Sequence, residues 1–191
     1  AWPALPQSVV ELQAINAALS LPGSTLITGA QATKANLKTA GLDRYSVIAF
    51  ATHGLVSGDL QTLREPALVM TASGDDDGLL TASEIAGLRL NAQWVILSAC
   101  NTGSAREAGG AGYSGLARAF RQAGARNVLV SLWPVRDDVA SKLSVATVRN
   151  YTKGQTQAQA LRTATLAMIN DRGAPNAGNP VVWAAFSLVS P

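Results

Sequence analysis

The sequence is poor in the two residue types that most often build crosslinks and metal centres, since it holds one cysteine and one histidine. A single cysteine excludes an internal disulfide. Because the chain also has only one histidine, it cannot form a metal site rich in cysteine or histidine. We therefore expect no metal. A fold that does not depend on disulfides is typical of a reducing compartment, so the expected location is the cytoplasm.

Charge and long apolar runs are also scarce. Charged residues make up 14% of the chain, and fifteen Lys and Arg against twelve Asp and Glu give a net charge of +3. The basic residues are scattered from Lys34 to Arg172, which argues against direct binding of nucleic acid. No run approaches the roughly 20 apolar residues of a membrane helix, and the opening AWPALPQS lacks the features of a signal peptide. We expect no membrane contact.

Two further things are missing. No glycine-rich phosphate loop lies between the first predicted strand and helix, which disfavours a nucleotide- or flavin-binding domain, and we expect no cofactor. The chain begins with Ala1 and not with methionine, so we expect Ala1 to be an internal position of a longer protein.

The 191 residues, 48% of them hydrophobic, are enough for one domain with a sizeable core, residues 1–191. Short β-branched apolar runs alternate with stretches of helical spacing, which predicts an α/β fold. Ser8 with Glu11, and Thr81 with Glu84, have the spacing of helix capping boxes. The predicted strands are 24–28, 45–51, 67–71, 94–99, 127–132 and 183–189, and the longer predicted helices are 9–19, 31–39, 113–123, 137–151 and 156–170.

The one histidine and the one cysteine each follow a predicted buried strand. His53 comes after 45–51 and Cys100 after 94–99, and the carboxyl edge of an open α/β sheet is where ligands bind. On adjacent strands, about 4.8 Å apart, an imidazole and a thiol could meet, with His53 as base and Cys100 as nucleophile. A small core cysteine and a structural histidine are the alternative for each residue taken alone. The two are 100 − 53 = 47 positions apart, and in caspases the separation is about 50.

The surroundings of both residues resemble a known family. Residues 50–54 (FATHG) and 97–103 (LSACNTG) are similar to the His and Cys motifs of CHAT domains, caspase-like modules often attached to tetratricopeptide repeats. The likeness extends from about Leu5 to Val189. Further matching blocks, in the family's order, are 78–85 (GLLTASEI), 115–120 (GLARAF), 131–135 (SLWPV) and 183–186 (WAAF).

The resemblance implies a caspase-like three-layer α/β/α sandwich around a mostly parallel sheet whose last strand is antiparallel. It also implies a cysteine endopeptidase in which the N–H groups of Gly54 and Cys100 form the oxyanion hole. Such a fold needs a central first strand ahead of the first helix, and we expect that strand upstream of this chain. A protein or peptide substrate and a regulatory repeat domain or activator protein are the implied partners.

The resemblance also suggests the substrate preference. In separases and arginine-directed caspase relatives, acidic side chains bind a basic P1 residue, and Asp137 or Asp138 holds the matching position here. Asp137 could instead cap the helix that begins there, and Arg136 stands where the family often has Asp. Trp133 and Ser98 are the other candidate substrate-binding residues. Because caspases carry Gln where this chain has Ser98, cleavage after aspartate is disfavoured.

Two alternatives stay open. Residues 73–84 place Asp75, Asp77, Gly78 and Glu84 at the spacing of an EF-hand loop, but Ser73 occupies the first ligand position, and a turn followed by a capped helix explains the same residues. The peptidase also has a rival of a different class, a catalytically idle interaction module with the same fold.

Overall fold

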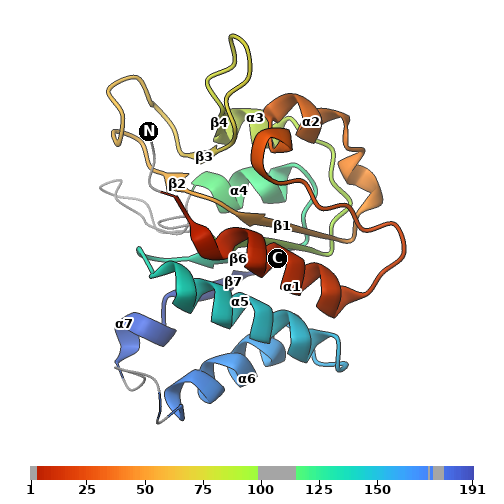
Figure 1. The fold of residues 1–191 in the computed structure, drawn as a ribbon, viewed down its shortest axis with the longest axis vertical. Helices are drawn as coiled ribbons and strands as arrows, with labels where there is room; N and C mark the ends of the chain where they lie inside the picture. Colours follow the sequence, from red (N-terminus) through yellow and green to blue (C-terminus); the bar gives the residue numbers. More distant parts are fainter. Residues whose placement is uncertain (1–3, 99–114, 172, 174–178) are drawn as a thin grey trace.

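The centre of the protein is a four-stranded sheet in the order β1, β5, β6, β7 (Figure 1). The structure is a computed structural model that describes residues 4–98, 115–171, 173 and 179–191. Neighbours β1, β5 and β6 are parallel, and β7 is antiparallel to β6. The predicted α/β class with an antiparallel last strand is thereby confirmed. The strands are β1 Val47–Ala51, β5 Trp94–Ser98, β6 Asn127–Ser131 and β7 Phe186–Val189.

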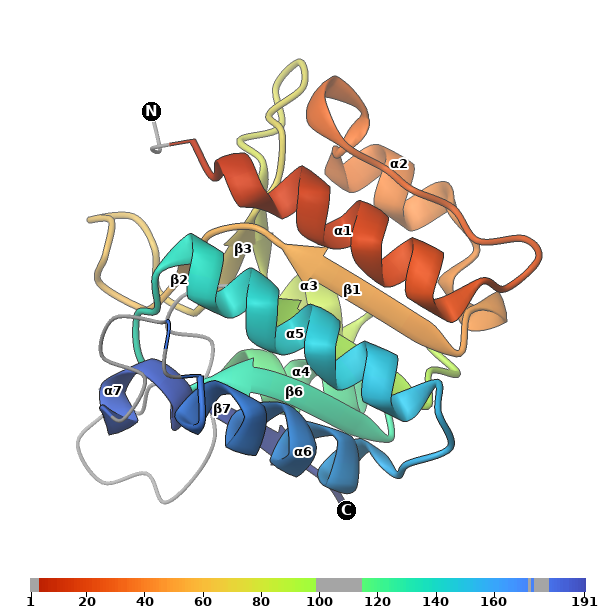
Figure 2. The same cartoon turned by 60° about the horizontal axis from the view of Figure 1, so that its bottom comes forward.

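Helices cover both faces of this sheet (Figure 2). On one face α1, α5 and α6 pack against Trp94 and Ile96, and on the other α3 and α4 pack against Val95 and Leu97. Because alternate residues of β5 point to opposite faces and both faces are covered, its residues 94–97 have to be apolar. The helices are α1 Pro6–Leu19, α2 Lys34–Thr39, α3 Ala82–Ala86, α4 Gly115–Gln122, α5 Asp137–Tyr151, α6 Gln157–Ile169 and α7 Pro180–Trp183.

A small antiparallel sheet follows β1 and carries the chain away from the carboxyl edge of the main sheet. It consists of β2 Gly54–Leu55, β3 Ala67–Val69 and β4 Leu79–Thr81, paired in that order. The predicted strand 67–71 therefore ends two residues early. The capping box of Thr81 and Glu84, which opens α3, is confirmed.

Two local predictions are wrong. Ser8 and Glu11 do not form a capping box, because α1 begins at Pro6 and Glu11 is buried inside the protein. Residues 24–28 do not form a strand; they run without a strand partner among the described residues, and Thr25 contacts Tyr45 through their hydroxyl groups at 2.7 Å. A β-branched pattern favours extended backbone, but a strand also needs a neighbour with which to pair.

No helix in the described part of the chain is both long and apolar enough to cross a membrane.

Candidate active site

The predicted site lies where β1 and β5 end. These strands are parallel neighbours in a register that pairs Ala51 with Ser98. His53 follows two residues after Ala51 and is half-buried. Cys100, the predicted nucleophile and second oxyanion donor, lies outside the described residues; in the sequence it follows Ser98 by two positions.

The backbone around His53 is tied to the end of β3. The Val69 N–H donates to the His53 carbonyl oxygen at 2.9 Å, and the Thr52 hydroxyl donates to the Val69 carbonyl oxygen. Gly54 is buried and pairs with Leu68 in the small sheet. No pattern in the sequence indicates this anchoring, which fixes the direction in which the chain leaves β1.

Asp137 and Ser98 share a small cavity at the same edge of the sheet. The cavity has a volume of about 30 Å³ and is also lined by Leu5, Thr52 and Ser131. Asp137 begins α5, yet no side chain caps that helix; its carboxylate accepts a hydrogen bond from the backbone N–H of Gln7 at 2.8 Å. Capping of its own helix, the alternative role, is therefore wrong, and Asp137 instead satisfies the start of α1.

Asp138 and Trp133, the other predicted substrate-binding residues, do not line this cavity. Asp138 accepts two hydrogen bonds from Arg136, both at 3.0 Å. This pairing, together with backbone contacts, holds the pKa of Asp138 below its usual range despite partial burial. The Trp133 indole N–H donates to the Val181 carbonyl oxygen at 3.0 Å, so it joins the end of β6 to α7.

Glu11 lies beside the candidate site, although the sequence pattern indicated only a helix cap there. Its side chain accepts a hydrogen bond from the Ser98 hydroxyl at 3.0 Å and another from the Ser144 hydroxyl of α5. Burial raises the pKa of Glu11 to about 7, and the negative charge of Asp137 adds to the increase, whereas the two serine hydroxyls oppose it. The available signal was its position four residues before Ile15, on the buried face of α1.

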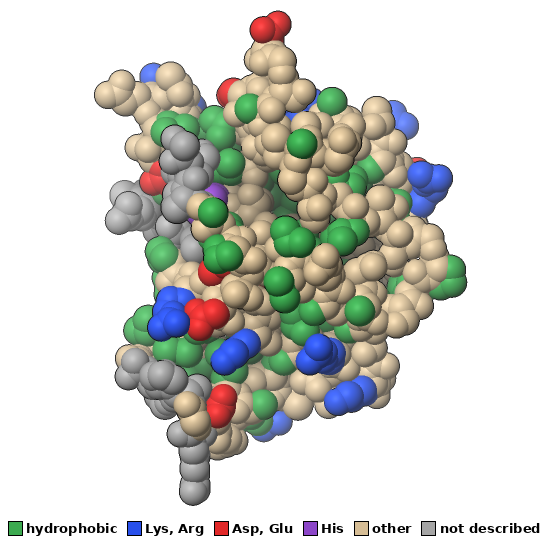
Figure 3. All heavy atoms as spheres, in the orientation of Figure 1, with side chains coloured by type: hydrophobic (Ala, Val, Ile, Leu, Met, Phe, Trp, Pro, Cys, Tyr) green, Lys and Arg blue, Asp and Glu red, His purple; other side chains and the backbone are tan. Residues whose placement is uncertain are grey.

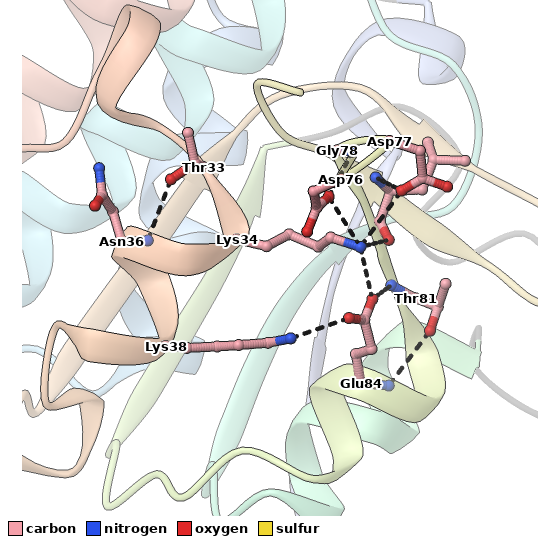
Figure 4. Close-up of polar contacts among 10 residues, drawn as sticks. Thr33, Lys34, Asn36, Lys38, Asp76, Asp77, Gly78, Thr81 and Glu84 are labelled. Atoms are coloured by element: carbon pink, nitrogen blue, oxygen red, sulfur yellow. Dashed lines mark hydrogen bonds and ion pairs between the residues drawn. The ribbon is translucent and has the colours of Figure 1, made fainter. Parts of the chain in front are cut away.

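The acidic segment that resembled an EF-hand loop surrounds a lysine. Figure 4 shows Lys34 and Lys38 extending from α2 toward this segment. The Lys34 ammonium group lies 3.2 Å from Asp76 and 3.4 Å from both Asp77 and Glu84. Although burial lowers the pKa of Lys34, these carboxylates outweigh it and the pKa is raised. The segment thus joins α2 to the turn before β4 and to α3.

The Lys34→Met variant tests this ion cluster. Because Lys34 is only 10% exposed and its loss leaves three carboxylates together, we expect the free energy of unfolding in urea to fall by about 2 kcal/mol. Lys38 contacts Glu84 at 3.2 Å but is 51% exposed, so Lys38→Met is a matched control with a loss below about 0.5 kcal/mol. Equal losses in the two variants would contradict this description.

A groove runs along the outer edge of β1. It has a volume of about 410 Å³, and it is lined by β1, α1, residues between 24 and 42, and residues 69–71 at the end of β3 and just after it. Among the described strands, β1 pairs with β5 alone, so its other edge faces this groove. In Figure 3 hydrophobic side chains gather over this middle part of the surface, whereas Lys and Arg side chains gather over α5 and α6.

Comparison with known proteins identifies the family. The model of the CHAT domain matches residues 1–191, the whole chain. Tetratricopeptide repeat protein 28 of Mus musculus is 34% identical over 111 residues, which are 58% of this chain and 4% of that protein. The chain thus spans a small fraction of the relative it matches. Since the family model covers the chain from end to end, this protein belongs to the CHAT domain family.

Proposed function

We propose that this domain is a cysteine endopeptidase with a caspase-like fold, in which His53 is the base and Cys100 the nucleophile. The observation that carries the proposal is the pairing of β1 with β5, because Ala51 is opposite Ser98 and each is followed by the candidate residue two positions later in sequence. Helices on both faces of the sheet support the three-layer architecture of that fold.

In the proposed reaction, His53 takes the proton of the Cys100 thiol, and the thiolate attacks the carbonyl carbon of the peptide bond. The imidazolium then protonates the departing amine, and water, activated by the same imidazole, hydrolyses the acyl-enzyme. The antiparallel pairing of β2 with β3 supports Gly54 as an oxyanion donor. Since Val69 N–H bonds to His53 O, the alternation of an antiparallel pair turns the Gly54 N–H away from β3.

Asp137 is the residue that we propose to bind a basic P1 side chain. It shares the small cavity with Ser98, whereas Asp138 is paired with Arg136. A cavity of about 30 Å³ holds roughly one water molecule. Binding of arginine or lysine therefore requires Leu5 and the first turn of α1 to move away from Asp137. This requirement supports a regulated peptidase that an activator protein or an attached repeat domain switches on.

We further propose that the groove beside β1 receives the additional strand implied by the caspase-like fold. The open strand edge and the extended segment 24–28 bound it on two sides, and α1 covers it. A strand seated there would give β1 its second neighbour, and its other edge would face the extended segment 24–28.

Covalent labelling tests the proposed function. Peptide chloromethyl ketones with P1 arginine, leucine or aspartate are incubated with the domain and with a longer form of the protein. Intact mass, beside the Cys100→Ala variant of each form, reports modification of Cys100. We expect arginine to label at least about tenfold faster than the others. Asp137→Asn removes this preference, and Asp43→Asn, located before β1 at its amino end, leaves it unchanged.

Each other outcome has a clear meaning. A loss of preference in Asp138→Asn alone assigns the P1 contact to that residue, and faster labelling with leucine or aspartate contradicts the basic pocket. Labelling of the longer form alone supports the need for an additional strand or activator. No labelling of either form by any of the three peptides favours the idle interaction module.

A further inference from the structure

Three polar side chains from three different elements meet inside an otherwise apolar region. Glu11 of α1 is 1% exposed, Ser98 of β5 is 8% exposed and Ser144 of α5 is fully buried. The two serine hydroxyls donate to different oxygens of the Glu11 carboxyl group. Their surroundings are the apolar side chains that pack α1 and α5 onto the sheet, among them Ile15 and Leu143.

Stability alone does not favour this arrangement. Burial of a carboxyl group is costly even when it is hydrogen-bonded, and apolar side chains of similar size are often at least as stable in such positions. Ile15, one turn after Glu11 on the same face of α1, is apolar and buried. What the polar contacts add is geometry, because directional hydrogen bonds fix how the three elements lie against one another.

The element that Glu11 fixes leads to the proposed nucleophile. Ser98 is the last residue of β5 and lines the cavity that holds Asp137. Ser144 lies two turns after Asp137 on α5, so the Glu11 carboxyl group contacts both the strand and the helix from which the proposed catalytic and P1-binding residues extend.

We propose that Glu11 is a positioning residue that holds the carboxyl end of β5 in register with α1 and α5 and thereby sets the reactivity of the proposed nucleophile, which follows two residues later in the sequence. This inference rests on the proposed function and deepens it. Glu11 acts through Ser98 and touches no substrate.

The protonation state of the Glu11 carboxyl group changes with pH near neutrality. Its pKa of about 7, against an ordinary value of 4.5, keeps the carboxyl group neutral in mildly acidic solution. Asp137 on α5 is the charged group that acts on it, and His53 lies at the same edge of the sheet. On α5, Asp138 is paired with Arg136, and Lys142 and Arg149 are exposed. The spans of β1 and β5 contain no charged residue.

The direction of the pH effect on stability follows from the raised pKa. Between pH 4.5 and about 7 the folded chain retains a proton that the unfolded chain has lost. This contribution to stability is complete below pH 4.5 and is lost as the pH rises through about 7. The melting temperature of Glu11→Gln should therefore depend less on pH than that of the wild type within this window.

Alkylation of Cys100 by iodoacetamide, followed by intact mass, tests the positioning role without a substrate. We expect folded Glu11→Leu to react about tenfold more slowly than the wild type. Glu11→Gln can still contact both serines, because its amide oxygen accepts from one hydroxyl and its amide N–H donates to the other. It should react at close to the wild-type rate but without an inflection near pH 7. Ser98→Ala should lower the alkylation rate by a similar factor. The double variant Glu11→Leu/Ser98→Ala should react no more slowly than Glu11→Leu alone, because both substitutions remove the same contact.

Thr147→Val is the matched control. Thr147 is buried on α5, one turn after Ser144, and its hydroxyl bonds to the Leu143 carbonyl oxygen of its own helix. We expect its alkylation rate to equal that of the wild type. If Glu11→Leu reacts at the wild-type rate and His53→Ala reacts slowly, the positioning role of Glu11 is overturned but the proposed function is not. His53→Ala reacting as fast as the wild type overturns the proposed function itself.

Discussion

His53→Ala is expected to lower kcat/KM for cleavage of a peptide with P1 arginine by about 10³- to 10⁴-fold. Removal of the imidazole leaves the thiol without a base and the departing amine without an acid. Cys100→Ala should lose at least as much activity, because no other cysteine exists in the chain. Steady-state cleavage of a fluorogenic peptide, in the form of the protein that the chloromethyl ketone labels, measures both losses.

Two controls separate this effect from misfolding. Thermal unfolding of His53→Ala should stay cooperative, since the His53 contact to β3 uses the backbone carbonyl oxygen, which alanine retains. Added imidazole should restore part of the lost activity, because it can enter the space that the side chain leaves. Retention of more than a tenth of the wild-type kcat/KM would refute a role for His53 as the base.

Gly124→Ala should be among the most destabilising single substitutions in this fold. Gly124 links α4 to β6 with φ of +116°, a conformation that disfavours any side chain. A Cβ atom here would also collide with the Leu90 carbonyl oxygen. The Leu90 backbone cannot easily move away, because its N–H donates to the Ala123 carbonyl oxygen at 2.8 Å. We expect a loss of about 3 kcal/mol or more in the free energy of unfolding, measured by urea denaturation.

Gly154→Ala isolates the part of this effect that the collision causes. Gly154 lies between α5 and α6 with φ of +91°, but nothing lies within 4 Å of the place that a Cβ atom would take. Its substitution should cost about 1 kcal/mol, from backbone strain alone. If both variants lose the same amount, close packing against Leu90 has no part in the effect.

The sequence was most informative about the elements that are buried on both sides. The apolar runs predicted as strands at 45–51, 94–99 and 127–132 correspond to β1, β5 and β6 with ends that differ by one or two residues. The helix predicted at 137–151 has the same bounds as α5. The strands are recognisable because burial on both faces requires continuous apolar residues, and the helix is recognisable by apolar residues at helical spacing. Both are local properties of the sequence.

Contacts between distant segments could not be predicted. Glu11 has the spacing of a cap residue, and nothing near it in the sequence indicates partners 87 and 133 residues away. The segment 24–28 has strand-like residues, but pairing depends on a neighbour that its own pattern cannot reveal. Asp137 has the position of a cap for its own helix, whereas its carboxylate accepts a hydrogen bond from the start of α1, and its predicted role in substrate binding stays a prediction.

Part of the candidate site could be predicted from the sequence in the same way as the strands. The strand ends that precede His53 and Cys100 follow from local patterns, and the structure makes those strands parallel neighbours. The pairing of Asp138 with Arg136, and the anchoring of the His53 backbone by Val69, depend on three-dimensional packing that single-residue patterns do not encode.

The position of α1 has a consequence for synthesis on the ribosome. This helix is made early, but the residues that hold it, Ser98, Asp137 and Ser144, are made 87 to 133 residues later. During that interval Glu11 lacks both serine partners, and α1 can pack against β1 but not against α5. Such non-local contacts form late and slowly, so the nascent domain exposes this helix until α5 has emerged. Docking of α1 is thus expected to be a late step of folding, and a nascent chain that stops before α5 should bind chaperones through this helix.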